Sequence, residues 1–73
     1  MDEEGKKERF SRIAANRTNR ILDQLRLLGN CSNTSNYSYT EEDVRKIFSA
    51  IENEVKIQKS KFEEKKRVKK FEL

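Results

Sequence analysis

Apolar residues at helical spacing form two stripes in this sequence, and these stripes limit the folds open to the chain. In the first stripe the members recur at three-, four- and seven-residue intervals, which places them on one face of a helix. The first stripe consists of Phe10, Ile13, Ala14, Ile21, Leu25 and Leu28. In the second stripe successive members are 4, 3, 4, 3 and 4 residues apart, the heptad spacing of packed helices. The second stripe consists of Val44, Phe48, Ile51, Val55, Gln58 and Phe62. The two stripes predict two amphipathic helices and an all-α fold.

Signals at the helix ends set the expected boundaries. Gly29 is the residue type best able to adopt the left-handed conformation that closes a helix. Thr40 is a favourable N-cap, and Asp43 three residues later makes a shortened capping box. The expected segments are a disordered N-terminus (1–7), a first helix (8–28), a polar loop (29–39), a second helix (41–62) and a basic tail or frayed helical extension (63–73).

The matched helices favour an antiparallel hairpin over residues 8–62. Only 33% of the 73 residues are hydrophobic, so a monomeric hairpin is expected to be marginally stable. Two hairpins packed into a four-helix bundle double the apolar burial, and we therefore expect a homodimer. The expected dimer interface consists of Phe10, Ile13, Ile21, Leu25, Leu28, Val44, Phe48, Ile51 and Val55.

Positive charge gathers at two places, although the net charge of +4 is too mild to identify a nucleic-acid binder. One place is the helix face opposite the first stripe, and the other is the C-terminal tail. Basic residues at both places can contact phosphates. Both places are also explained as solvated surface, because many acids stand four residues before a basic residue, as Glu41 does before Arg45, and can form ion pairs on the helix surface. The candidate nucleic-acid-binding residues are Arg9, Arg12, Asn16, Asn19, Arg20, Lys65, Lys66 and Arg67.

Arg17 differs from the other arginines because it lies inside the first stripe, between Ala14 and Ile21. An unpaired buried arginine is too costly to expect. Three alternatives remain: Arg17 reaches the edge of the stripe, pairs with an acid such as Glu52 or Glu54, or marks a hydrated centre.

The uncharged segment between the helices is longer than the connections usual in bundles. One interpretation is a loop that packs on itself, with Asn and Ser side chains satisfying the backbone. The other is a recognition loop for a macromolecular partner, with Asn33, Asn36, Tyr37 and Tyr39 as candidate contacts.

The inventory of reactive side chains favours binding over catalysis. Histidine is absent and Cys31 is the single cysteine, so we expect no enzyme, no metal site, no cofactor and no small-molecule substrate. A lone cysteine fits a reducing cytosol, and the acidic N-terminus lacks the apolar run of a secretory signal. No membrane association is expected, and the expected location is the cytoplasm.

Four stretches of the sequence resemble a group of small uncharacterised cytosolic proteins encoded by Firmicutes and their mobile elements. The stretches are RTNRIL (17–22), LLGNCSN (27–33), YSYTEEDV (37–44) and IFSAI (47–51). The resemblance covers about residues 9–62 and implies a helical hairpin in a bacterial setting. It implies no established activity, so it assigns no functional residue.

These observations lead to one expected function and one alternative. The first is a non-enzymatic, homodimeric interaction or adaptor module that presents the polar loop and the arginine-bearing face to a macromolecular partner. The alternative is an accessory nucleic-acid-binding protein of a bacterial mobile element, with phosphate contacts from the arginines of the first helix and the lysine-rich tail.

Overall fold

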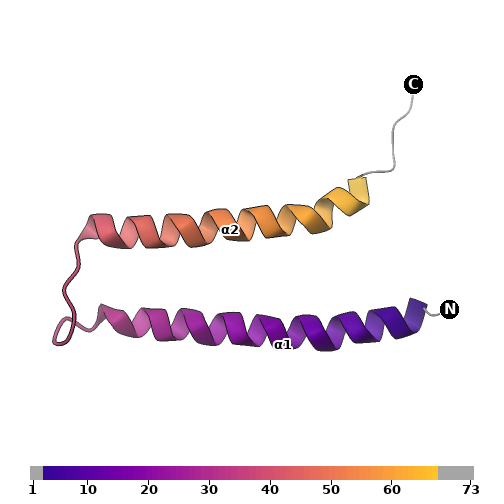
Figure 1. The fold of residues 1–73 in the computed structure, drawn as a ribbon, viewed down its shortest axis with the longest axis horizontal. Helices are drawn as coiled ribbons and strands as arrows, with labels where there is room; N and C mark the ends of the chain where they lie inside the picture. The colour runs from indigo at the N-terminus through magenta and orange to yellow at the C-terminus, as the bar shows by residue number, and fades with distance from the viewer. Residues whose placement is uncertain (1–2, 68–73) are drawn as a thin grey trace, which may run out of the picture. The chain divides into compact units, whose positions relative to one another are not determined.

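The computed structural model describes the backbone of residues 3–67 and the side chains of residues 4–63. The elements in chain order are α1 (Glu3–Gly29), the short 3-10 helix η1 (Asn30–Ser32) and α2 (Glu41–Arg67) (Figure 1). Within this described range there are two α-helices and no strand, which confirms the all-α class. The chain divides between Ser38 and Tyr39 into two units, one holding α1 and η1 and the other holding α2.

Helix α1 begins at Glu3, which corrects the expected start at residue 8. Residues 3–7, expected to be disordered, form the first turns of this helix. Glu4 stands in the first turn, where negative charge complements the helix dipole. The negative charge therefore favours a helix in this segment. The sequence prediction began the helix later because the segment lacks the apolar residues that mark an amphipathic helix.

The C-terminal end of α1 also differs from the prediction, because the helix includes Gly29 and continues into η1. Gly29 has φ −60° and ψ −27°, an ordinary right-handed helical conformation. No residue in the described range, glycine or other, has a positive φ. The turn instead tightens, and the N–H of Asn33 donates to the carbonyl oxygen of Asn30 at 3.2 Å. A 3-10 turn satisfies carbonyl groups at a helix end without the left-handed residue that we expected.

Residues 33–40 form the connection, which is shorter than the expected loop over 29–39. Asn33 organises its first half. The carbonyl oxygen of Asn33 accepts from the N–H of Asn36 at 3.1 Å and from that of Tyr37 at 3.0 Å. Its side-chain Oδ1 accepts from the N–H of Ser35 at 2.9 Å, which makes an Asx turn.

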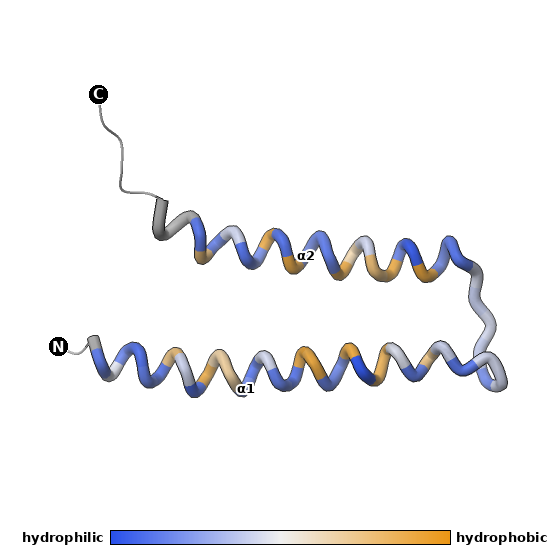
Figure 2. The backbone as a smooth tube through the Cα atoms, turned by 180° about the vertical axis from the view of Figure 1, so that it is seen from behind, coloured by the Kyte–Doolittle hydropathy of each residue, from blue (hydrophilic) through white to orange (hydrophobic). Residues whose placement is uncertain are grey.

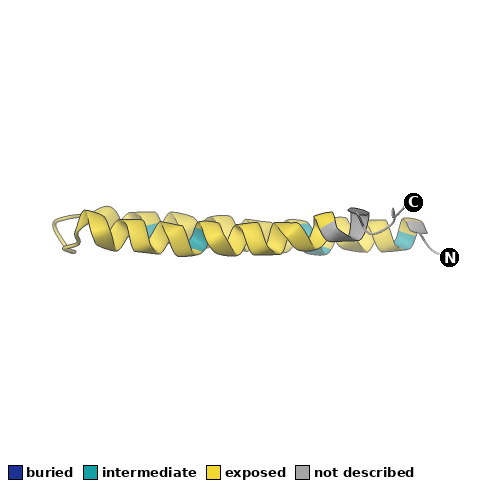
Figure 3. Cartoon of the chain, turned by 90° about the horizontal axis from the view of Figure 1, so that it is seen from above, coloured by how far each residue is buried: buried dark blue, intermediate teal, exposed yellow. Residues whose placement is uncertain are grey.

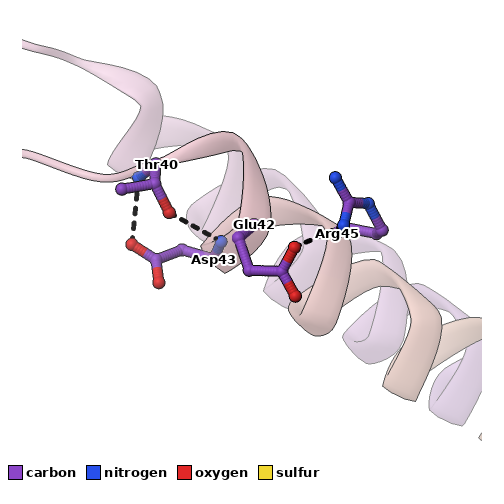
Figure 4. A network of polar contacts seen from close by, with 4 residues as sticks. All are labelled: Thr40, Glu42, Asp43 and Arg45. Atoms are coloured by element: carbon purple, nitrogen blue, oxygen red, sulfur yellow. Dashed lines mark hydrogen bonds and ion pairs between the residues drawn. The ribbon is translucent and has the colours of Figure 1, made fainter.

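Helix α2 begins at Glu41, as predicted, and Thr40 and Asp43 cap it reciprocally (Figure 4). The N–H of Asp43 donates to Thr40 Oγ1 at 3.0 Å, and the N–H of Thr40 donates to Asp43 Oδ2 at 2.9 Å. These two bonds confirm the shortened capping box. The helix reaches Arg67, so the start of the expected tail is a helical extension, and residues 68–73 of that tail lie outside the described residues.

No side chain in the described part of the chain is buried. Apolar residues recur along both helices (Figure 2), yet both helices are exposed along almost their whole length (Figure 3). Only Gly5, Ile13, Ala14, Leu28 and Ile51 reach intermediate exposure. The apolar stripe of each helix is therefore a surface.

Candidate interaction surfaces

The stripe on α1 is an exposed apolar surface. Phe10 and Ile21 are 57% and 59% exposed, and Ile13 and Leu28 are half-buried. Residues four apart on a helix stand one above the other, so these side chains share one face. The five predicted interface residues of α1, which include Leu25, thus form one surface on one element.

The stripe on α2 forms a second exposed surface, which we call the α2 seam: Val44, Phe48, Ile51, Val55, Gln58 and Phe62. Val55 is 58% exposed, whereas Ile51 in the middle of the seam is half-buried. The one amide in the seam has a partner on its own helix, because Gln58 Nε2 donates to Glu54 Oε2 at 2.6 Å. The four predicted interface residues of α2 all lie on this seam.

Ile57 is an exposed apolar residue that the sequence reasoning missed. It is 45% exposed and lies two residues after Val55, outside the heptad positions. Leu22 and Leu27 similarly lie beside the α1 stripe and are exposed. Both helices therefore carry apolar area beyond what one partner helix covers.

The arginine face of α1, defined as Arg9, Arg12, Asn16, Asn19 and Arg20, is exposed throughout. The ion pairs that the structure gives between described side chains are Arg26 with Asp23, at 3.0 Å, and Arg45 with Glu42 (Figure 4). Neither pair involves the arginine face. The backbone of the last turn of α2 includes Lys65, Lys66 and Arg67, whose side chains lie outside the described residues.

The observed ion pairs differ in spacing from the predicted ones. Arg45 contacts Glu42, three residues before it, and not Glu41, four residues before it. Both spacings bring side chains together on a helix surface, and at exposed sites they differ little in energy. The local choice therefore rests on rotamers, which the sequence does not specify.

The candidate recognition loop divides into structural and exposed members. Asn33 uses its side-chain oxygen and its carbonyl oxygen to hold the turn over residues 33–37. Asn36 donates its backbone N–H to that turn, and its side chain is exposed. Tyr37 and Tyr39 are about half exposed, which leaves aromatic surface on both sides of the unit boundary.

Two surface hollows lie on the described residues. A surface hollow on α1 is lined by Glu4, Lys6, Lys7, Glu8 and Phe10, and another on α2 is lined by Ser49, Glu52, Asn53, Val55, Lys56 and Lys59. Each of these hollows is lined by residues of a single helix. In the searched range no three His, Cys, Asp or Glu residues gather as metal ligands, and Cys31 is a free, exposed thiol in η1.

Neither α1 nor the described part of α2 combines the length and apolar content needed to cross a membrane. No protein-family model matches the chain, and neither a curated protein nor a solved structure is similar to it.

Proposed function

We propose that this protein is a non-enzymatic interaction module that works as a homodimer in the cytoplasm of a bacterium. One observation carries the proposal: two regular helices, each with a stripe of apolar residues along one face, bury no side chain in the described range. An exposed apolar face of this length is costly in water and indicates that another helix covers it. The occupant to which we commit is this chain itself: α2 covers α1 in a hairpin, and a second copy covers the rest.

The spacing of the two stripes supports the hairpin. Six α1 positions have the same 4-3-4-3-4 spacing as the α2 seam: Phe10, Ala14, Ile21 and Leu28 of the stripe together with Arg17 and Gln24. The stripe members Ile13 and Leu25 lie outside this set. Two helices that cover one another in a hairpin need apolar positions that repeat with the same spacing, and α1 and α2 meet this condition.

A second copy of the chain accounts for the remaining apolar area. Leu22, Leu27 and Ile57 lie beside the two stripes and are exposed. Two hairpins packed face to face cover four stripes at once, which is the arrangement of a four-helix bundle. An isologous dimer also stops at two copies, because each copy buries the same surface and leaves none exposed for a third copy.

Sedimentation velocity and light scattering across micromolar concentrations test the dimer. We expect twice the chain mass at the highest concentration and dissociation on dilution. A folded monomer at every concentration contradicts the second copy.

Oxidative cross-linking in a Cys31→Ser background tests the hairpin. The probe carries Ile21→Cys and Ile51→Cys, one from each apolar stripe, and the matched control carries Ile21→Cys and Ile57→Cys, because Ile57 lies outside the α2 seam. Rapid intramolecular disulfide formation in the probe alone supports the hairpin, whereas equal rates in both contradict it.

The arginine face supports a second candidate function, accessory nucleic-acid binding. Arg9, Arg12 and Arg20 are exposed on α1 and take part in neither ion pair that the structure gives between described side chains. Affinity capture from a native bacterial lysate, with and without nuclease, separates the candidates. Capture of one protein that survives nuclease supports the adaptor. Capture that nuclease abolishes, with affinity for mixed DNA or RNA that weakens as salt rises, supports the nucleic-acid binder.

A further inference from the structure

The segment from Arg9 to Leu22 of α1 carries positive charge that nothing in the segment balances. It contains four arginines and no acid. The next acid along the helix, Asp23, is already paired with Arg26 at 3.0 Å. Helix α2 has a different balance, because seven acids accompany its eight basic residues. Positive potential is therefore concentrated on one part of α1, where it attracts an anionic partner.

The side chains of the arginine face have a definite layout around the α1 axis. Successive residues of a helix are turned by about 100°, so Arg9 and Arg20 lie within about 20° of each other and form one edge of the face. Arg12 and Asn19 form the other edge, and Asn16 lies between the two edges. All five side chains are exposed. The face thus presents positive charge along both edges and an amide in the middle.

This layout matches the major groove of double-stranded DNA. The groove is about 12 Å wide and admits a helix of about 10–12 Å diameter. Arginine binds the phosphates that line both sides of a groove, and asparagine recognises adenine through the N6 and N7 atoms on the groove floor. Arg9 and Arg20 stand about 16.5 Å apart along the axis, so the edge that they form extends past more than one phosphate of a strand.

Double-stranded RNA offers the same phosphates, but its major groove is too deep and narrow for side chains to read. We propose that the arginine face of α1 binds the major groove of double-stranded DNA, with Arg9, Arg12 and Arg20 on phosphates and Asn16 on an adenine. This inference rests on nucleic-acid binding, the second candidate of the proposed function, and deepens it by naming the nucleic acid, the groove and the contacts. The α1 stripe lies on the other side of the helix and stays available to a partner helix.

Fluorescence anisotropy tests the phosphate contacts, with the full chain titrated into a labelled DNA duplex of mixed sequence at several salt concentrations. Arg9→Ala, Arg12→Ala and Arg20→Ala should each weaken binding at least three-fold. Each should also lower the slope of log affinity against log salt by about one, because one phosphate contact is lost. Arg45→Ala is the matched control, since Arg45 already pairs with Glu42 on α2, and it should change the affinity less than two-fold. Equal losses in the control and in the three variants overturn the proposal.

Arg20→Lys separates loss of a phosphate contact from a change in the helix. It keeps the positive charge and should retain the salt slope of the parent, because lysine also binds phosphate. Circular dichroism at the same protein concentration should give the helix content of the parent for every arginine variant. A salt slope for Arg20→Lys equal to that for Arg20→Ala overturns the phosphate contact.

Asn16→Ala tests the base contact. Selection from a pool of random DNA duplexes should enrich adenine at one position with the parent chain and not with Asn16→Ala. Both proteins should bind mixed-sequence DNA within two-fold of each other, since the arginines are unchanged. Replacing the selected adenine by 7-deazaadenine removes the N7 acceptor and should weaken the parent at least five-fold and Asn16→Ala less than two-fold. Equal effects on both proteins, or no enrichment of adenine, overturn the base contact.

Two competitors test the choice of partner. A double-stranded RNA of the selected sequence should bind at least ten-fold more weakly than the DNA, and equal or tighter binding overturns the major-groove contact. Polyglutamate carries negative charge without a groove or bases, so it should not displace the DNA at equal charge concentration. Displacement as effective as that by unlabelled DNA overturns the choice of DNA in favour of an acidic polypeptide.

The inference and the function on which it rests fail in distinguishable ways. If the chain binds no nucleic acid at low salt, the second candidate function fails together with the inference, and the dimeric module keeps its own tests. If the chain binds DNA and the three alanine variants bind as tightly as the parent, nucleic-acid binding stands and the arginine face is not its site.

Discussion

Thr40 and Asp43 each donate a backbone N–H to the side chain of the other, at 2.9 and 3.0 Å, and so cap the start of α2 together. Two of the donors that a helix start leaves unpaired are satisfied by these bonds. Both bonds join residues only three positions apart, so they form without help from any other part of the chain. The start of α2 is therefore specified locally.

Replacing Thr40 by Ala removes the hydroxyl that accepts from the Asp43 amide. We expect α2 to lose about 1 kcal/mol of stability, because N-cap substitutions of this kind typically remove that amount. The measurement is hydrogen exchange at the Asp43 amide, which should accelerate roughly five-fold at that free energy. Thr34→Ala, in the turn of the loop, is the matched control, and equal acceleration in both variants would contradict the cap.

Gly29→Ala is expected to stabilise the protein. Gly29 has right-handed helical angles, and a Cβ added there meets nothing within 4 Å. Alanine in a compatible helical position raises stability by about 0.5–1 kcal/mol, mainly by restricting the unfolded chain. Thermal unfolding followed by circular dichroism checks this. A fall in melting temperature would indicate that Gly29 adopts the left-handed conformation that its residue type first suggested.

The contrast between Thr40 and Gly29 shows which parts of this fold can be predicted from sequence. Thr40 and Asp43 carry side-chain atoms that make specific bonds, so the sequence predicts their geometry. Gly29 permits the left-handed conformation but does not require it. The early start at Glu3 was missed for a related reason, because acids in a first turn favour a helix without marking its first residue.

Periodic spacing in the sequence predicts the apolar residues that repeat along a helix face, but it does not predict apolar residues that stand outside the repeat. Ile21 and Ile51 follow from the heptad spacing, whereas Ile57 belongs to no repeating pattern and was passed over. The contact of Arg45 with Glu42 depends on a rotamer choice between two nearly equal acids. Sequence spacing thus predicts the face of a helix better than the individual contacts on it.

Asn33→Ala should loosen the turn that follows η1, because Asn33 Oδ1 accepts from the Ser35 amide at 2.9 Å. The net loss for one exposed hydrogen bond is about 0.5–1 kcal/mol. Nuclear magnetic resonance should show a steeper temperature dependence for the Ser35 amide proton. Asn33→Asp keeps the acceptor and should preserve the parent behaviour, while Asn36→Ala controls for loss of an amide elsewhere in the turn. A Ser35 amide unaffected by Asn33→Ala would refute the Asx turn.

Ile51→Asp should disrupt self-association, because Ile51 lies at the middle of the α2 seam and is already half-buried within its own unit. A charge at a covered position costs several kcal/mol, so the dimer dissociation constant should rise at least a hundred-fold. Sedimentation equilibrium measures this constant. Asn53→Asp places the same charge at an exposed polar position of the same helix, outside the α2 seam, and should raise it less than ten-fold. An equal rise in both variants would contradict the assignment of Ile51 to the interface.

The tight 3-10 turn after α1 has a consequence for chain length. Because η1 carries the helix onward to Ser32, residues 33–40 alone connect it to α2. Fully extended, this segment reaches about 26–29 Å at 3.3–3.6 Å per residue. Lengthening a connection of this kind costs little entropy. An epitope tag inserted between Ser38 and Tyr39 should leave the Asn33 turn and the Thr40 cap undisturbed, which makes this junction a natural attachment point for recovering the protein with its partners.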